Sequence, residues 1–304
     1  MSILVFGSLN MDLVVRANRL PVPGETVVGQ EFSTVPGGKG ANQAVAAAKL
    51  AIATRMVGRV GNDGFGRDLL TSLHAAGVET AGILIDESAQ TGVAAIAVEQ
   101  GGENQIIIIP GANGQVDETD AARVIPWIAG ATTLLLQCEV PMEAVLAAAR
   151  AARQTNTLVV IDPAPVPANF PAELYELANI ITPNETEASQ LVGFPVDDVE
   201  RAERAASILR QRGVETAIIK LGGQGAVCAS SAETFHQPAF AVDAVDTVAA
   251  GDAFNAALAV ALTKECSLRE AVRWGAAAGA LSAAKLGAQT ALPNWQELHA
   301  FLQS

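Results

Sequence analysis

The second half of the chain alternates short apolar runs with longer amphipathic stretches. Four runs have the length and apolar character of buried strands: 134–136, 158–161, 180–181 and 217–219. The stretches between them have helical spacing at 142–154, 184–192 and 199–212. The apolar run Ile3–Phe6 predicts a further buried strand, and the last 55 residues have helical spacing almost throughout. This rhythm predicts an α/β fold: a doubly wound, mostly parallel sheet flanked by helices.

Residues 92–110 follow a different pattern. Two apolar β-type runs, 91–98 and 105–109, flank the Gly-rich stretch 101–104, which is typical of a β-hairpin without a crossover helix. With the segments at about 12–18 and 27–35, this hairpin could form a small separate sheet, a β-sheet lid over the main domain. The alternative is an antiparallel edge of the main sheet. Because no linker or low-complexity tract divides the chain, we expect residues 1–304 to form a single domain.

Composition narrows the class of protein. Half of the 304 residues are hydrophobic, yet no stretch reaches the 18 or more apolar residues of a membrane span. The N-terminus lacks a positively charged leader, so we expect a cytoplasmic protein with no membrane partner. A net charge of −13 disfavours nucleic acid as a partner. Cys138, Cys228 and Cys266 are widely spaced, which argues against a disulfide framework or a zinc site.

Polar residues follow several of the predicted strands. In open α/β sheets, ligands bind at the carboxyl ends of the strands. The residues at those positions are Asn10, Asp12, Glu139, Asp162, Asn184, Glu187 and Asp246. We therefore look for the site among them.

The most informative motif lies at 243–254. Small residues at 249–251 lead into a helix that we expect to begin near Asp252. Backbone N–H groups and the helix dipole would form an anion hole there, suited to a phosphoryl group in transfer. The Asp252 carboxylate could accept the proton of an attacking hydroxyl. The alternative is that Asp252 serves only as a helix N-cap.

Three further motifs are individually weaker. Gly37–Asn42 has glycines that permit close backbone approach, but Gly40 follows Lys39, so it is not a Walker A loop. Asn184 and Glu187 lie three residues apart and could hold the water shell of Mg²⁺; the alternative is an ordinary capped helix. The Gly-rich turn 220–225 could pass close to a nucleotide.

Together, in this order, these motifs resemble the ribokinase-like (PfkB) family of sugar and nucleoside kinases along essentially the whole chain. The segments Gly7–Asp12, Pro23–Thr26 and Gly37–Ala44, and the Ala249-Ala250 pair before Gly251-Asp252, carry the resemblance most specifically. It implies a ribokinase-like fold and an enzyme that transfers phosphate from ATP to a sugar hydroxyl. The leading substrate it implies is D-ribose, phosphorylated at its 5-hydroxyl.

The resemblance also implies roles for individual residues. Asp252 would be the catalytic base, with the anion hole formed by Ala249, Ala250 and Gly251. The sugar would be bound by Asn10, Asp12, Gly38, Lys39, Asn42, Glu139 and Asp252. ATP would be bound by Asn184, Lys220, Leu221, Gly222, Gly223, Gln224, Gly225, Gly251 and Ala276.

Two metal ions are implied in the same way. Glu187 would organise Mg²⁺ through water. A K⁺ activator would lie behind the anion hole, at Asp246, Val248, Ser282, Lys285, Gly287 and Ala291. Ala291 stands where the family often has Ser, and Ala276 stands at an adenine position that is often polar.

Other assignments remain open. Apolar residues at 106–109 would leave an exposed face and free edges on the lid, so pairing of two lids would give a homodimer, as the resemblance also implies. The substrate could instead be that of a fructokinase, deoxyribokinase or adenosine kinase type, with Ile96 and Ile108 deciding ring size. A non-catalytic sugar-binding regulator is disfavoured because Asp252 is present. A nicotinamide dehydrogenase is disfavoured because no G-x-G-x-x-G motif follows the first strand.

Overall fold

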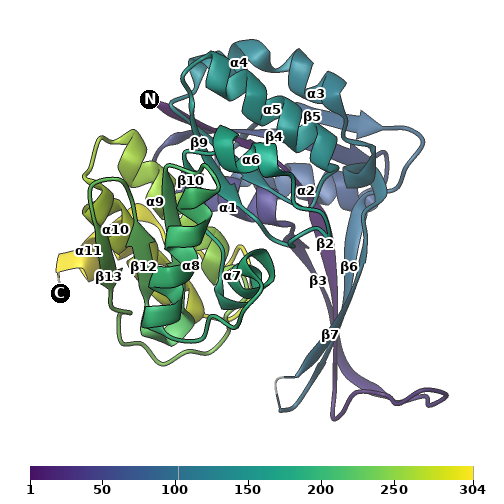
Figure 1. Ribbon diagram of the computed structural model, residues 1–304. Coiled ribbons are helices and arrows are strands. Elements are labelled where there is room, and N and C mark those ends of the chain that lie inside the picture. The colour runs from purple at the N-terminus through teal and green to yellow at the C-terminus, as the bar shows by residue number, and fades with distance from the viewer. Residues whose placement is uncertain (102, 304) are drawn as a thin grey trace.

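The structure is a computed structural model that describes residues 1–101 and 103–303 and contains two β-sheets with surrounding helices (Figure 1). Gly102, in the loop of the expected hairpin, and Ser304 lie outside the described residues. In the described part, no helix is long and apolar enough to cross a membrane.

The main sheet has nine strands in the order β13-β12-β11-β10-β9-β8-β1-β4-β5. Their bounds are β1 (Ser2–Phe6), β4 (Ala53–Gly61), β5 (Glu79–Asp86), β8 (Thr133–Gln137), β9 (Leu158–Asp162), β10 (Ile180–Ile181), β11 (Thr216–Lys220), β12 (Ala226–Ala229) and β13 (Thr234–Gln237). Every pairing from β11 to β5 is parallel, whereas β12 and β13 add an antiparallel edge. The strand order reverses between β1 and β8, which is where doubly wound sheets bind ligands.

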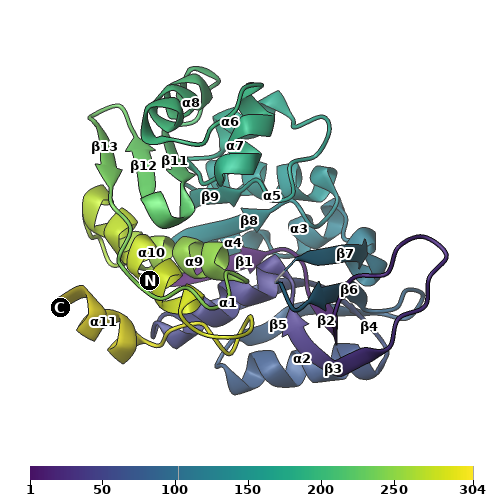
Figure 2. The same cartoon turned by 90° about the horizontal axis from the view of Figure 1, so that it is seen from below.

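Helices cover both faces of this sheet (Figure 2). One layer contains α1 (Lys39–Lys49), α2 (Gly64–Ala75), α9 (Ala250–Thr263), α10 (Leu268–Ala283) and α11 (Trp295–Gln303). The other contains α3 (Glu118–Arg123), α4 (Ile125–Gly130), α5 (Met142–Gln154), α6 (Ala172–Leu177), α7 (Glu185–Val192) and α8 (Val199–Gln211). In β1, Ile3 and Val5 belong to one core, while Leu4 and Phe6 belong to the other. This two-sided burial confirms the predicted doubly wound class and explains why the strands are apolar on both faces.

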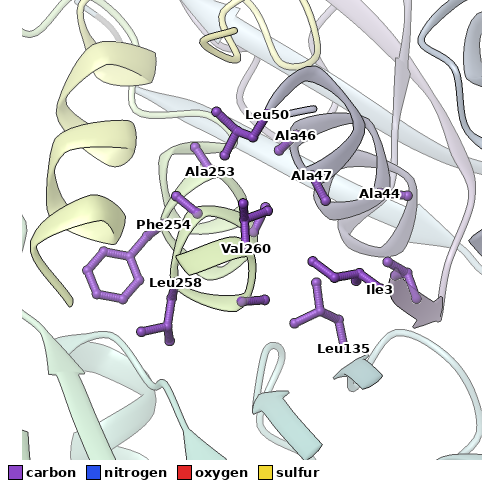
Figure 3. Packing of buried hydrophobic residues seen from close by; sticks show 14 of the residues in the cluster. Ile3, Ala44, Ala46, Ala47, Leu50, Leu135, Ala253, Phe254, Leu258 and Val260 are labelled. Carbon is purple, nitrogen blue, oxygen red and sulfur yellow. The ribbon is translucent and has the colours of Figure 1, made fainter. Parts of the chain in front are cut away.

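Packing of α1 against α9 forms the centre of one core (Figure 3). Ala46 and Ala47 of α1 are small enough to let α9 approach closely, and Ala253 and Val260 lie on the facing side of α9. Ile3 and Leu135, from β1 and β8, close this core from the sheet side. The two helices therefore bring their N-terminal turns together at the carboxyl edge of the sheet.

The second sheet has four strands in the order β3-β2-β6-β7 and projects from the main body (Figure 1). Its strands are β2 (Asn10–Ala17), β3 (Gly29–Gly37), β6 (Gly92–Glu99) and β7 (Asn104–Ile109). The pairs β2–β3 and β6–β7 are antiparallel, and β2–β6 is parallel. The small second sheet is therefore confirmed, and the alternative of an edge on the main sheet is wrong.

One boundary differs from expectation. Helix α9 begins at Ala250, two residues before the expected start, and its N-cap is Ala249 in a left-handed conformation with φ of 58°. Alanine offers no side chain to cap a helix, so the sequence carries no capping signal at that position. Asp252 is consequently the third residue of α9 and not its N-cap.

Candidate active site

A cavity of about 840 Å³ lies at the carboxyl ends of the main-sheet strands, and the second sheet forms one of its walls. The wall from β6 and β7 is apolar and contains Ala94, Ile96, Ile106 and Ile108. The charged side chains that line the cavity are Asp12, Lys39, Glu139, Asp162, Glu185, Glu187, Lys220 and Asp252. A cavity of this size can hold two small molecules side by side.

The N-terminus of α9 presents free donors to the cavity. In the described part of the chain, the N–H groups of Gly251 and Asp252 have no hydrogen-bond acceptor, whereas the Ala250 N–H donates to the Thr247 carbonyl at 3.2 Å. The left-handed Ala249 is a sparsely populated backbone conformation for a non-glycine residue, and it turns the chain into this helix. Unpaired N–H groups at a helix N-terminus form an anion site.

Asp252 is buried beside these donors. Its Oδ2 accepts a hydrogen bond from Asn42 Nδ2 at 3.0 Å, and its Oδ1 accepts one from Gln43 Nε2 at 3.1 Å. Burial raises the pKa of Asp252 to about 6; Asp162 adds to the rise, while Lys39 and the two amides oppose it. A carboxylate with this pKa is ionised at neutral pH and still basic enough to accept a proton.

The expected sugar-binding residues lie together around Asp252. Lys39 donates its backbone N–H to Glu139 Oε2 at 3.0 Å, and Asn10 lines the same part of the cavity. Gly38 has φ of 88°, and a Cβ there would lie 2.7 Å from the Asn10 backbone nitrogen, so only glycine fits. The structure therefore brings these residues together with Asp12 and Asn42 at one end of the cavity.

Several charged side chains lie close together among the expected sugar-binding residues. Burial raises the pKa of Asp12 to about 7, with Glu139 and Asp252 adding to the rise. Burial would lower the pKa of Lys39, but the surrounding carboxylates more than offset this and raise it above its ordinary value. Lys39 is therefore a fixed cation among acidic side chains, which is an arrangement that can bind several hydroxyl groups.

The expected nucleotide-binding residues occupy the other end. Asn184, Lys220, Gly251, Ala276 and three loop glycines line the cavity there, the glycines being Gly222, Gly223 and Gly225. Two residues of the predicted ATP-binding set do not line the cavity. Leu221 is buried in the core, and Gln224 directs its side-chain amide to the Asp197 carbonyl at 2.9 Å.

Asn184 and Glu187 form a capping box at the start of α7. Glu187 Oε2 accepts the Asn184 backbone N–H at 2.8 Å, Oε1 accepts Asn184 Nδ2 at 2.9 Å, and Asn184 Oδ1 accepts the Glu187 N–H at 2.9 Å. The capped-helix alternative thus describes the local geometry, and both residues still line the cavity. Burial and the charge of Asp162 raise the pKa of Glu187.

The residues expected to hold K⁺ lie outside the cavity lining, except Val248. Asp246 joins two of them: its Oδ1 accepts the Val248 N–H and its Oδ2 accepts the Gly287 N–H, both at 3.0 Å. Ser282 is buried, and its hydroxyl has no hydrogen-bond partner among residues 1–101 and 103–303, whereas its carbonyl accepts the Lys285 N–H at 3.1 Å. Ala291 is fully buried.

Four site residues were not assigned a role from the sequence. Gln43 contacts Asp252 and Asp162, and it follows Asn42 in a motif that the resemblance already singled out. Asp162 is the last residue of β9, and its position at the end of a predicted strand was the sequence feature that pointed to it. Two others contact side chains that are expected to bind the sugar: Ser8 donates to Glu139 at 2.5 Å, and Asn113 donates to Asn10 at 2.8 Å.

The fold, the helix-terminal anion site and the adjacent buried carboxylate are typical of a phosphotransferase. The sequence matches the family model described as pfkB family carbohydrate kinase over residues 1–295. The chain therefore belongs to the pfkB family of carbohydrate kinases.

Within this family, the chain is similar to ribokinases. The chain is 39% identical over 302 residues to the ribokinase of Haemophilus influenzae, covering 99% of this chain and 98% of that one. It is 38% identical to the ribokinase of Mus musculus, covering 98% and 93%. Its structure resembles that of Arabidopsis thaliana ribokinase complexed with ribose and ATP, with a TM-score of 0.93, 33% identity and coverage of 100% and 99%. The ribokinase of Thermotoga maritima gives a TM-score of 0.90 at 37% identity, with the same coverage.

Proposed function

We propose that this protein transfers the γ-phosphoryl group of ATP to the 5-hydroxyl of D-ribose, which yields D-ribose 5-phosphate and ADP. One observation carries the proposal: the buried Asp252 carboxylate lies in the cavity at the unpaired N–H groups of α9, in hydrogen-bond contact with Asn42. Similarity to ribokinases along nearly the full chain supports ribose as the acceptor.

Asp252 acts as the base. As the sugar oxygen attacks, a new O–P bond forms, the bond from phosphorus to the β–γ bridging oxygen breaks, and ADP leaves with that electron pair. The hydroxyl proton passes to the Asp252 carboxylate, which Asn42 and Gln43 hold in place. The N–H groups of Gly251 and Asp252 stabilise charge on the transferring group, since they lie at the N-terminus of α9 without an acceptor among the described residues.

Sugar selection follows from the polar and the apolar residues that line the cavity. Asp12 and Glu139 offer acceptors to the hydroxyls, and Lys39 and Asn42 offer donors. Ile96 and Ile108 of the second sheet form the apolar wall that limits ring size. A site that pairs each hydroxyl discriminates strongly against analogues that leave its buried polar groups unpaired.

Mg²⁺ fits the charge balance of the site. Carboxylates outnumber the two lysines in the cavity lining, so a cation must accompany the phosphates of ATP. Among residues 1–101 and 103–303, no cluster of three or more His, Cys, Asp or Glu could hold a metal ion alone. Mg²⁺ would therefore be held by ATP and, through water, by Glu187, and it would neutralise phosphate charge.

K⁺ fits the candidate oxygen ligands around Asp246, behind the anion hole. Its candidate ligands are one carboxylate, that of Asp246, and the carbonyls of Val248, Ser282, Lys285, Gly287 and Ala291. The buried Ser282 hydroxyl, which has no partner in the part of the chain that the structure describes, supports a polar occupant nearby. A cation there would stabilise the backbone at 248–251.

A screen for ADP release across pentoses, ketohexoses and nucleosides tests the substrate. With Mg-ATP as donor, ribose should give the highest kcat/KM. A tenfold higher value for fructose or adenosine would replace ribose with that substrate and leave the kinase chemistry intact.

A further inference from the structure

Asp162 connects the two ends of the cavity. It ends β9, and its side chain is only 3% exposed. Its Oδ1 accepts a hydrogen bond from Lys220 Nζ at 3.2 Å, and its Oδ2 accepts one from Gln43 Nε2 at 3.2 Å. Lys220 belongs to the nucleotide end, whereas Gln43 contacts the base Asp252. One carboxylate thus contacts both the phosphate side and the sugar side of the site.

The orientation of the Gln43 amide is determined by a third residue. Gln137 donates from Nε2 to Gln43 Oε1 at 2.7 Å, so the NH₂ group of Gln43 must face the other way. That group has two hydrogens, and it donates one to Asp252 Oδ1 at 3.1 Å and one to Asp162 Oδ2. Both carboxylates are therefore held by a single amide that cannot turn without losing three buried hydrogen bonds.

Lys220 lies at the anion hole. Its Nζ is 3.4 Å from the position that a Cβ on Gly251 would occupy, which is beside the unpaired N–H groups of α9. An ammonium group has three donors, and the Asp162 bond uses one of them. The other two have no acceptor within residues 1–101 and 103–303, so they can donate to phosphate oxygens at the place where the γ-phosphoryl group would be transferred.

We propose that Asp162 is a positioning residue that holds Lys220 against the anion hole and, through Gln43, aims the base Asp252. This inference rests on the proposed kinase function; it adds Asp162 to the site and gives Lys220 a specific role at the transferring group. Lys220 contributes positive charge to the transferring phosphoryl group, as lysines commonly do at phosphate sites. Asp162 contacts neither substrate and acts only through its two partners.

The charge of Asp162 also acts on the base. It raises the pKa of Asp252, so a neutral residue at 162 leaves Asp252 a weaker base with a lower pKa. The other charged groups around this pair would remain in such a variant. They are Asp12 on β2, Lys39 on α1, Glu187 on α7 and Lys220 on β11, together with Glu139 after β8.

The test compares Asp162→Asn, Lys220→Met and the double variant with the wild type, by kcat and KM for ATP from pH 5 to 9 at saturating ribose. In Asp162→Asn, kcat should fall about 10- to 100-fold. The acid limb of its kcat–pH profile should shift to lower pH by about 0.5–1 pH unit. Lys220→Met should raise KM for ATP and should not move the limb down. Asp162→Asn should also raise KM for ATP, since Asp162 acts on ATP through Lys220. The increases in KM caused by the two single substitutions should therefore be non-additive in the double variant.

A purely structural ion pair would behave differently. It would lower the unfolding temperature of Asp162→Asn while the acid limb and KM for ATP stayed at wild-type values, and that result would overturn the inference. Glu173→Gln, which breaks the exposed pair with Arg150, is the control and should change nothing. If Asp162→Asn does not fold, Asp162→Glu keeps the charge but displaces Lys220, so an unchanged KM for ATP would also refute the proposal.

Failure of the proposed function gives a separate result. A wild type inactive on ribose would refute the substrate assignment. Calorimetric binding of a non-hydrolysable ATP analogue, which keeps the γ-phosphoryl group, to the wild type and Lys220→Met would still test the phosphate contact. Equal affinity of the two proteins for this analogue would show that Lys220 does not bind the γ-phosphate.

Discussion

Asn42 donates a hydrogen bond to the carboxylate of Asp252 at 3.0 Å, although 210 positions separate the two residues in the chain. Asn42 lies in the first turns of α1 and Asp252 in the first turn of α9, and the alanine-rich contact between these helices places the two turns side by side (Figure 3). The contact between α1 and α9 therefore forms part of the core and also places Asn42 next to the Asp252 carboxylate.

Asn42→Ala should move the acid limb of activity to higher pH. The hydrogen bond from Asn42 lowers the pKa of Asp252, so its loss raises that pKa above about 6 and keeps the base protonated to higher pH. A kcat–pH profile measures the shift, which is opposite in sign to that expected for Asp162→Asn. A limb that stays in place would show that this hydrogen bond does not tune the base.

Asp252→Asn should stabilise the folded protein at high pH and not at low pH. The folded-state pKa of about 6 exceeds that of an exposed aspartate, so ionisation of Asp252 costs stability as pH rises through that range. A neutral amide removes the cost. We expect the variant to have a Tm about 2 to 4 °C higher at pH 8 and an unchanged Tm at pH 4.

The local structure can accept this variant. Asn42 Oδ1 is buried and has no partner among the described residues, so a turn of that amide lets it accept a hydrogen from the amide that Asp252→Asn introduces. A Tm difference that does not depend on pH would mean that Asp252 is not the group whose ionisation costs stability.

K⁺ should raise kcat through Asp246. The measurement is a titration of KCl against a bulky organic cation at constant ionic strength and saturating Mg-ATP. Activation should vanish in Asp246→Ala and strengthen in Ala291→Ser, since Ser adds a side-chain oxygen where Ala291 offers only its carbonyl. Equal rates in the two salts would mean that this chain lacks cation activation.

The second sheet should form a dimer interface. Ile107 and Ile109 of β7 are 68% and 48% exposed, while Ile106 and Ile108 line the cavity on the other face of the strand. An exposed apolar face beside an unpaired strand edge favours pairing with a second copy. Light scattering should give a dimer for the wild type and a monomer for Ile107→Lys.

The control for this experiment is Ile125→Lys on α4, which is also exposed but lies outside the second sheet. It should remain a dimer. A wild-type mass of 31 kDa at micromolar concentration would rule out the dimer.

Local pattern predicted the elements well and the long-range contacts less well. Helix α5 occupies the predicted range 142–154, because its apolar spacing is regular from end to end. The start of α9 was missed because Ala249 makes its turn by backbone geometry and not by a capping side chain. Asp162 was visible as a strand-end residue, but its partners Gln43 and Lys220 are 119 and 58 positions away, so only the folded chain joins them.

The central claim is that Asp252 removes the proton from the ribose hydroxyl during phosphoryl transfer from ATP. The most direct test measures kcat for ADP release and the affinity for ribose on one preparation each of wild type and Asp252→Asn. The account predicts that ribose binding is retained within a few-fold while kcat falls by about 10²–10⁴. A folded Asp252→Asn protein with a near-normal kcat would contradict it.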